Sequence, residues 1–193
     1  MLPVHIAGLG WYLPPRCVPN AEFAERLGVA PEAVTRVVIS HAHGDHIWGA
    51  VRSAGERRVP TFPGARYHLP RPDWDWLQQA PDSPGTRLLG VVEAAGQLVL
   101  DDPDGEIVPG LLSIDTAGHS PGHRCLALEA GGRTFCFLGD LTHVPALHFA
   151  RPDCVTAFDH TPALTPPARR RLAERAVAGD WLLAAAHAPF PSL

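Results

Sequence analysis

The stretch Ser40-His41-Ala42-His43-Gly44-Asp45-His46 decides how this chain is interpreted. It directly follows the apolar run Val37-Val38-Ile39, which is typical of a short buried strand. Histidine is the commonest metal-ligating side chain, and carboxylate oxygen also binds zinc-like ions. Several histidines and an aspartate in one turn after a strand therefore predict a metal site rather than a solvated loop.

Further ligands must come from elsewhere in the chain, because a catalytic ion takes about three protein ligands and keeps one position open. Three later residues each follow an apolar segment, namely His119, Asp140 and His187. In layered α/β proteins, binding sites gather at the ends of strands. We therefore expect these residues to meet the turn at 41–46 and to form more than one metal site with it.

Together these segments resemble the metallo-β-lactamase superfamily of metal-dependent hydrolases. The matching motifs are H-A-H-G-D-H at 41–46, G-H-S-P-G-H at 118–123, G-D at 139–140 and A-H-A-P-F-P at 186–191. The resemblance extends from about residue 20 to residue 191. It implies an α/β fold, a four-layer αββα sandwich, which in this chain would be trimmed at the N- and C-termini.

The resemblance also implies two divalent metal ions that share a hydroxide, which acts as the nucleophile. Carried over residue by residue, the ligands of the first ion are His41, His43 and His119, those of the second ion are Asp45, His46 and His187, and Asp140 bridges both ions. Zinc is the first choice for histidine and carboxylate ligands, and manganese, iron, cobalt and nickel are alternatives.

The segment 139–143 and the helical pattern at 166–178 are similar to the lactonase and methyl parathion hydrolase branch of the superfamily. That similarity implies lactones, aryl esters or phosphotriesters as small-molecule substrates. Asp45 stands where zinc β-lactamases of the best-known subclass have a cysteine, which counts against β-lactam hydrolysis. The open alternatives are a thioesterase of the glyoxalase II type, a β-lactamase, and a degenerate metal-binding protein without catalysis.

Catalytic roles are expected for Asp45, Asp140 and His143. Asp45 could accept the proton of the attacking water, and His143, three residues after Asp140, could hydrogen-bond a substrate oxygen. We expect His123 and Asp159 to support the ligands from behind. The aromatic candidates for the substrate pocket are Trp48, Trp74 and Trp76.

Length and composition fit one domain over residues 1–193, with an irregular Pro-rich segment at 1–19. The net charge of -4 gives no basic excess, so nucleic acid is not an expected partner. Arg169, Arg170 and Arg171 interrupt this picture, but their helical pattern favours a solvated helix face over an anion site. No apolar run is long enough for a membrane span, and no signal peptide is recognised, so the expected location is cytoplasmic.

Along the chain, helices are expected at 21–27, 47–54, 70–80 and 166–178, and the helical region that begins at 70 is expected to continue brokenly to 95. Strands are expected at 36–40, 59–62, 66–68, 97–100, 106–108, 111–115, 124–129, 133–139 and 181–186. Relatives usually have further strands before and after this set. Their absence would leave sheet edges uncovered, so we predict a homo-oligomer.

Overall fold

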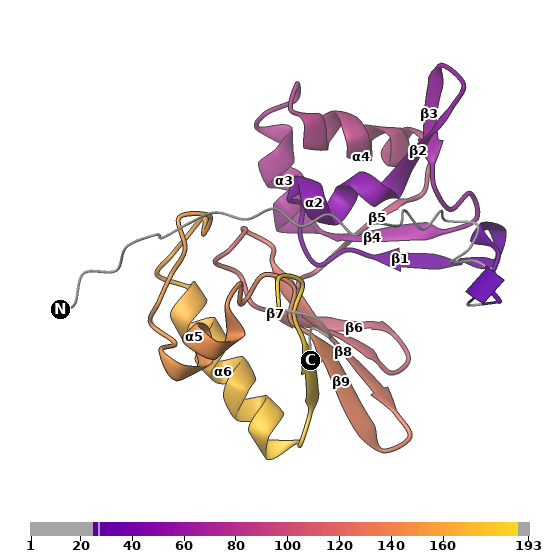
Figure 1. Ribbon diagram of the computed structural model, residues 1–193. Helices are drawn as coiled ribbons and strands as arrows, with labels where there is room; N and C mark the ends of the chain where they lie inside the picture. Colours follow the sequence, from indigo (N-terminus) through magenta and orange to yellow (C-terminus); the bar gives the residue numbers. More distant parts are fainter. Residues whose placement is uncertain (1–24, 27, 189–193) are drawn as a thin grey trace, which may run out of the picture.

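The structure, a computed structural model, describes residues 25, 26 and 28–188. Two β-sheets lie between outer helices, as the αββα prediction requires (Figure 1). The irregular segment predicted at 1–19 and most of the helix predicted at 21–27 lie outside the described residues. The first described element is a short 3-10 helix, η1 (Pro31–Ala33), where proline occupies the first helical position.

The first half of the molecule contains a three-stranded parallel sheet covered by helices. Its strands, in spatial order, are β1 (Arg36–Val38), β4 (Arg66–Pro70) and β5 (Leu98–Asp101). The helices α3 (Arg71–Gln78) and α4 (Pro84–Ala94) pack on this sheet (Figure 1). Tyr67 and Leu69 from β4 and Leu89 and Val92 from α4 are fully buried in the core of this half.

The second half contains a five-stranded sheet with the order β10-β9-β8-β7-β6. Its strands are β6 (Gly105–Val108), β7 (Leu111–Asp115), β8 (Arg124–Ala130), β9 (Arg133–Phe137) and β10 (Leu182–Ala184). The accompanying helices are α5 (Pro145–Ala150) and α6 (Thr165–Ala178). Ala168 and Leu172 of α6 pack with Cys125 and Cys136 of the sheet in a separate core.

The predicted helix at 47–54 is wrong. A one-turn helix, α2 (Gly44–Ile47), and a 3-10 turn, η2 (Trp48–Ala50), are followed by a hairpin of β2 (Val51–Ala54) and β3 (Arg57–Pro60). Gly55 adopts a positive φ of 63° in the hairpin turn, a conformation that glycine adopts without steric cost. Gly55 therefore forms the tight turn that allows β2 and β3 to pair.

Arg169 also differs from the prediction of a solvated helix face. Its side chain is buried, with Nε donating to the carbonyl of Leu141 at 3.0 Å and Nη1 donating to the carbonyls of Pro152 and Cys154. A helical charge pattern cannot show that a distant loop will supply acceptors to one of its arginines. Among the described residues, no helix is long and apolar enough to cross a membrane.

The sheet topology brings the predicted ligand segments together. β9 and β10 are parallel, and β7 runs in the same direction because two antiparallel pairings separate it from β9. The carboxyl ends of β7, β9 and β10 therefore share one edge of the sheet. The loop after β1 reaches that edge from the other half, where the backbone N–H of Arg124 donates to the carbonyl of Ser40 at 3.1 Å.

Candidate metal centre

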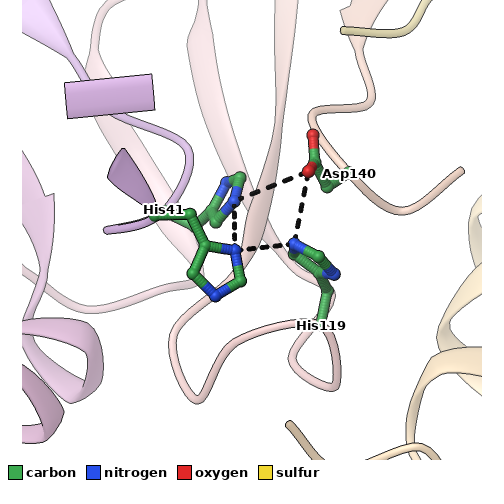
Figure 2. A group of neighbouring side chains, drawn as sticks. His41, His119 and Asp140 are labelled. Carbon is green, nitrogen blue, oxygen red and sulfur yellow. Dashed lines mark hydrogen bonds and ion pairs between the residues drawn. The ribbon is translucent and has the colours of Figure 1, made fainter. Parts of the chain in front are cut away.

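The first cluster of ligand-type side chains joins both halves of the molecule. His41 and His43 follow β1, His119 lies in the loop between β7 and β8, and Asp140 follows β9. One ligand atom from each of the four lies within 4.8 Å of the others. Figure 2 shows His41, His119 and Asp140 pointing toward one another. His41 and His119 are almost completely buried, which holds their rings in place.

The distances in this cluster suit a cation. Nδ1 of His43 lies 3.1 Å from Nε2 of His41 and 2.8 Å from Nε2 of His119. Nε2 of His119 also lies 3.2 Å from Oδ2 of Asp140. An imidazole nitrogen carries either one proton or one lone pair, so these atoms cannot all satisfy one another. Their convergence fits the donor set of a zinc-like ion.

A second cluster consists of Asp45, His46 and His187, again within 4.8 Å of one another. Asp45 and His46 belong to α2, whereas His187 follows β10. Nε2 of His46 and Oδ1 of Asp140 are buried without a hydrogen-bond partner, although they lie only 3.1 Å apart. Two orphaned buried polar atoms that face one another fit a shared ion better than a hydrogen bond.

Asp140 belongs to the first cluster and also contacts His46 and His187 of the second. Its Oδ2 lies 3.1 Å from Nε2 of His187 and 3.8 Å from Nε2 of His41. Burial opposes the charged form, but the close contacts with His119, His143 and His46 outweigh it and hold the pKa of Asp140 well below its usual range. The carboxylate is therefore ionised, and it lies within reach of histidines from both clusters.

His119 is held on both sides of its ring. Nδ1 lies 3.1 Å from Oδ1 of Asp159, whose other oxygen accepts the N–H of Thr156. Burial alone would lower the pKa of His119, but its contacts with Asp140 and Asp159 outweigh burial and raise it to about 9. Burial, together with the charge of His119, lowers the pKa of His43 to about 4. A carboxylate behind a metal-ligating histidine fixes its tautomer and orientation.

One family profile matches most of the chain. The family described as the metallo-beta-lactamase superfamily matches residues 10–187, which include every residue of the two clusters. The chain belongs to the metallo-β-lactamase superfamily.

Solved structures of this superfamily have the same fold. The hydrolase AbOPH is 26% identical with a TM-score of 0.71, and the match covers 88% of this chain and 62% of AbOPH. AidC, a dizinc quorum-quenching lactonase, is 20% identical with a TM-score of 0.69, covering 88% of this chain and 62% of AidC. An N-acyl homoserine lactone hydrolase with its product bound at the catalytic metal centre is 21% identical with a TM-score of 0.69, covering 86% and 61%.

This member of the metallo-β-lactamase superfamily thus spans about three fifths of the length of those structures. No curated protein sequence matches it. The predicted superfamily and αββα fold are confirmed. The neighbours include lactonases, in keeping with the predicted branch.

The two clusters open into a cavity of about 500 Å³. Its lining contains His43, Gly44, Asp45, His119, Asp140, His143, Phe158 and His187. Nε2 of His143 lies 3.3 Å from Oδ2 of Asp140, and its ring stacks on His187 with centroids 5.1 Å apart. His143 therefore lies beside the ligand clusters and on the cavity wall, where its side chain can contact a bound ligand.

The three predicted aromatic residues have different environments. Trp76 contacts His43 edge-on, with ring centroids 5.7 Å apart. Trp48 is 63% exposed and lines a neighbouring cavity of about 670 Å³ beside Arg58 and Arg87. Trp74 is only 8% exposed within the first core, which corrects the expectation that it lines a substrate pocket.

Several residues around the centre were missed by sequence reasoning. Phe158 is 73% exposed on the cavity wall, and Asp73 is a fully buried carboxylate between the ligand loops. Their positions depend on contacts between distant segments. The only sequence signal for Asp73 is its place in the first turn of the helix after β4. Acidic residues are too common at that position to indicate a buried role.

Proposed function

We propose that this chain is a dinuclear metal-dependent hydrolase that acts on lactones, aryl esters or phosphotriesters. The observation that carries the proposal is the convergence of two ligand clusters on Asp140 at the floor of one cavity. Membership of the superfamily supports hydrolysis, and the names of the structural neighbours favour lactones.

In this proposal, His41, His43 and His119 would hold the first ion. Asp45, His46 and His187 would hold the second ion, and Asp140 would contribute to both sites. Two bound divalent ions would supply Lewis acidity and lower the pKa of a shared water toward neutrality. Histidine and carboxylate donors suit zinc first, while manganese, iron, cobalt and nickel remain compatible with them.

The side chains around the cavity would handle the substrate. His143 donates a hydrogen bond to a substrate oxygen from its position above Asp140, where its side chain is 18% exposed. Asp45, whose side chain is 56% exposed, accepts the proton released by water. Phe158 and Trp76 offer apolar faces to an acyl or aryl group, in keeping with the largely apolar walls of small-molecule sites.

Hydrolysis of a neutral aromatic lactone, an aryl ester and an aryl phosphotriester by one preparation tests the proposal. Each reaction is measured on the chelated chain and after re-addition of zinc or manganese. Metal-dependent turnover of at least one of these substrates is expected. Selective turnover of a thioester or a β-lactam would favour the two hydrolase alternatives, and metal retention without any turnover would favour a degenerate binding protein.

Four further predictions accompany this function. They are a single domain, a cytoplasmic location, a homo-oligomer that covers exposed sheet edges, and the absence of a nucleic-acid partner. Within the described residues, β1 and β10 are terminal strands of their sheets. Light scattering at low micromolar concentration tests the oligomer, and a stable monomer would contradict it.

A further inference from the structure

The metal centre is assembled between two separately packed halves. His41, His43, Asp45 and His46 belong to the half that carries α3 and α4, and the remaining ligands belong to the half that carries α6. The hydrophobic cores of the two halves have no residue in common among the described residues. The distances between ligands therefore depend on how the halves are fixed to one another.

Asp73 reaches from the first half into the second. It lies in the first turn of α3 and is completely buried. Its Oδ2 accepts the N–H of Ala42 at 2.7 Å and the hydroxyl of Ser120 at 2.9 Å, while Oδ1 accepts the N–H of Gly122 at 2.6 Å. Ala42 lies between two ligands of the first ion, and Ser120 directly follows the third, His119. One carboxylate thus binds both ligand loops.

The loop around Gly122 is shaped to meet Asp73. A Cβ at position 122 would lie 2.8 Å from Cβ of Pro70, 3.0 Å from the backbone nitrogen of Asp73 and 3.1 Å from its Oδ1. Contacts this short leave no room for a side chain. Glycine therefore permits the close approach that brings this N–H onto the carboxylate.

Arg124 reaches in the opposite direction. It lies at the start of β8 and is completely buried. Its Nε donates to the carbonyl of Ile39 at 3.0 Å, Nη2 donates to the carbonyl of His68 at 3.0 Å, and Nη1 pairs with Asp101 at 3.1 Å. These acceptors come from all three strands of the first sheet: Ile39 directly follows β1, His68 lies within β4 and Asp101 ends β5. Arg124 therefore fastens the second sheet to the first sheet, next to the strand that leads to the metal turn.

We infer that Asp73 and Arg124 are positioning residues, which hold the two half-sites in register for metal binding without contacting the ions. Burying a charged group is costly unless hydrogen bonds compensate it. Asp73 connects Ala42 of its own half with Ser120 and Gly122 of the other half, and Arg124 directs its three side-chain contacts from the second half into the first. The inference rests on the proposed metal centre and on no particular substrate.

Zinc affinity, measured by competition with a chelator, tests the role of Asp73. Asp73→Asn keeps the shape but places an NH₂ group against at least one donor, so at least one of the three hydrogen bonds is lost. We expect zinc binding to weaken about 10–100-fold, the usual effect of removing a partner behind a metal ligand. The absorption spectrum of the cobalt-substituted chain should change as well. Asp75→Asn, an exposed carboxylate on the same helix, is the matched control and should change neither.

The role of Arg124 is tested in the same way with Arg124→Met, for which Arg133→Met on an exposed residue of β9 is the control. Circular dichroism and thermal unfolding of the metal-free chains establish that each variant folds. Should Asp73→Asn fail to fold, Ser120→Ala removes one of the three hydrogen bonds and should weaken zinc binding several-fold.

The inference would be overturned if folded Asp73→Asn had wild-type zinc affinity and an unchanged cobalt spectrum. The same result in Ser120→Ala would overturn it where Asp73→Asn does not fold. Either result would leave the proposed function intact. A wild-type chain that binds no zinc would overturn both.

Discussion

The ring of His123 accepts a hydrogen bond from the backbone N–H of Asp140, with 3.0 Å between Nε2 and the amide nitrogen. Its Nδ1 lies 2.8 Å from Oγ1 of Thr116. Because Nε2 acts as the acceptor, the proton belongs on Nδ1 and is donated to the threonine. His123 is completely buried, and burial lowers its pKa to about 3. A neutral imidazole therefore fixes the backbone of Asp140, which lies between the two clusters.

Replacing His123 by phenylalanine should destabilise the metal-free chain by about 1–3 kcal/mol, because the N–H of Asp140 would be buried without an acceptor. His123→Gln, which retains an acceptor and a donor, should be less destabilising. Urea unfolding of both variants measures the difference. Equal stability of His123→Phe and the wild type would show that this hydrogen bond does not hold Asp140.

Gly139 should not tolerate a side chain. It has a positive φ of 54°, and a Cβ would lie 2.8 Å from Nε2 of His123. We expect Gly139→Ala to lower the free energy of unfolding by at least about 1–2 kcal/mol, since strain and overpacking add. Gly90→Ala is the matched control: this α4 position has no neighbouring heavy atom within 4 Å, so the change should be neutral or stabilising by up to about 1 kcal/mol.

His143→Phe should lower kcat by about 10²–10³-fold, the usual loss when one donor to a developing oxyanion is removed. Zinc content, measured by atomic emission, should stay at the wild-type value. His160→Asn, at an exposed histidine outside the cavity lining, should leave kcat unchanged. Loss of one zinc ion from His143→Phe would instead identify His143 as a ligand of the second ion. The ligand atoms of His143, Asp140 and His187 lie close enough together for such a role.

Metal binding should stabilise the whole fold, because each cluster takes ligands from both halves of the molecule. At a free metal concentration of 100 Kd, one ion adds about 2.7 kcal/mol to the free energy of unfolding. Thermal unfolding with zinc and with a chelator measures this effect. A midpoint that does not respond to zinc would contradict binding between the halves.

The sequence predicted the second half of the fold more accurately than the first. The strands expected at 111–115, 124–129 and 133–139 correspond to β7, β8 and β9, because their apolar runs are bounded by glycines and a hairpin turn. The segment 47–54 was misassigned since its pattern fits a helix or a hairpin strand equally well, and pairing between β2 and β3 decides the outcome. The short helix α5 was not expected.

The candidate ligands could be named because their motifs resemble a known superfamily, and the structure brings them within reach of one another. The residues behind them were predicted only in part. His123 and Asp159 were expected to support the ligands, and they lie beside Asp140 and His119. The burial of Asp73 and Arg169 by contacts with distant loops was not expected, because a charged residue in a helix is usually solvated. Only the tertiary structure identifies the partners that make their burial favourable.

The most direct test of a dinuclear hydrolase is a titration of the metal-free chain with zinc, in which bound zinc and lactone hydrolysis are measured at every step. The account predicts that two zinc ions bind per chain, that turnover depends on them, and that Asp140→Asn abolishes it. A folded chain that binds two zinc ions yet hydrolyses no lactone, aryl ester or phosphotriester would contradict the account.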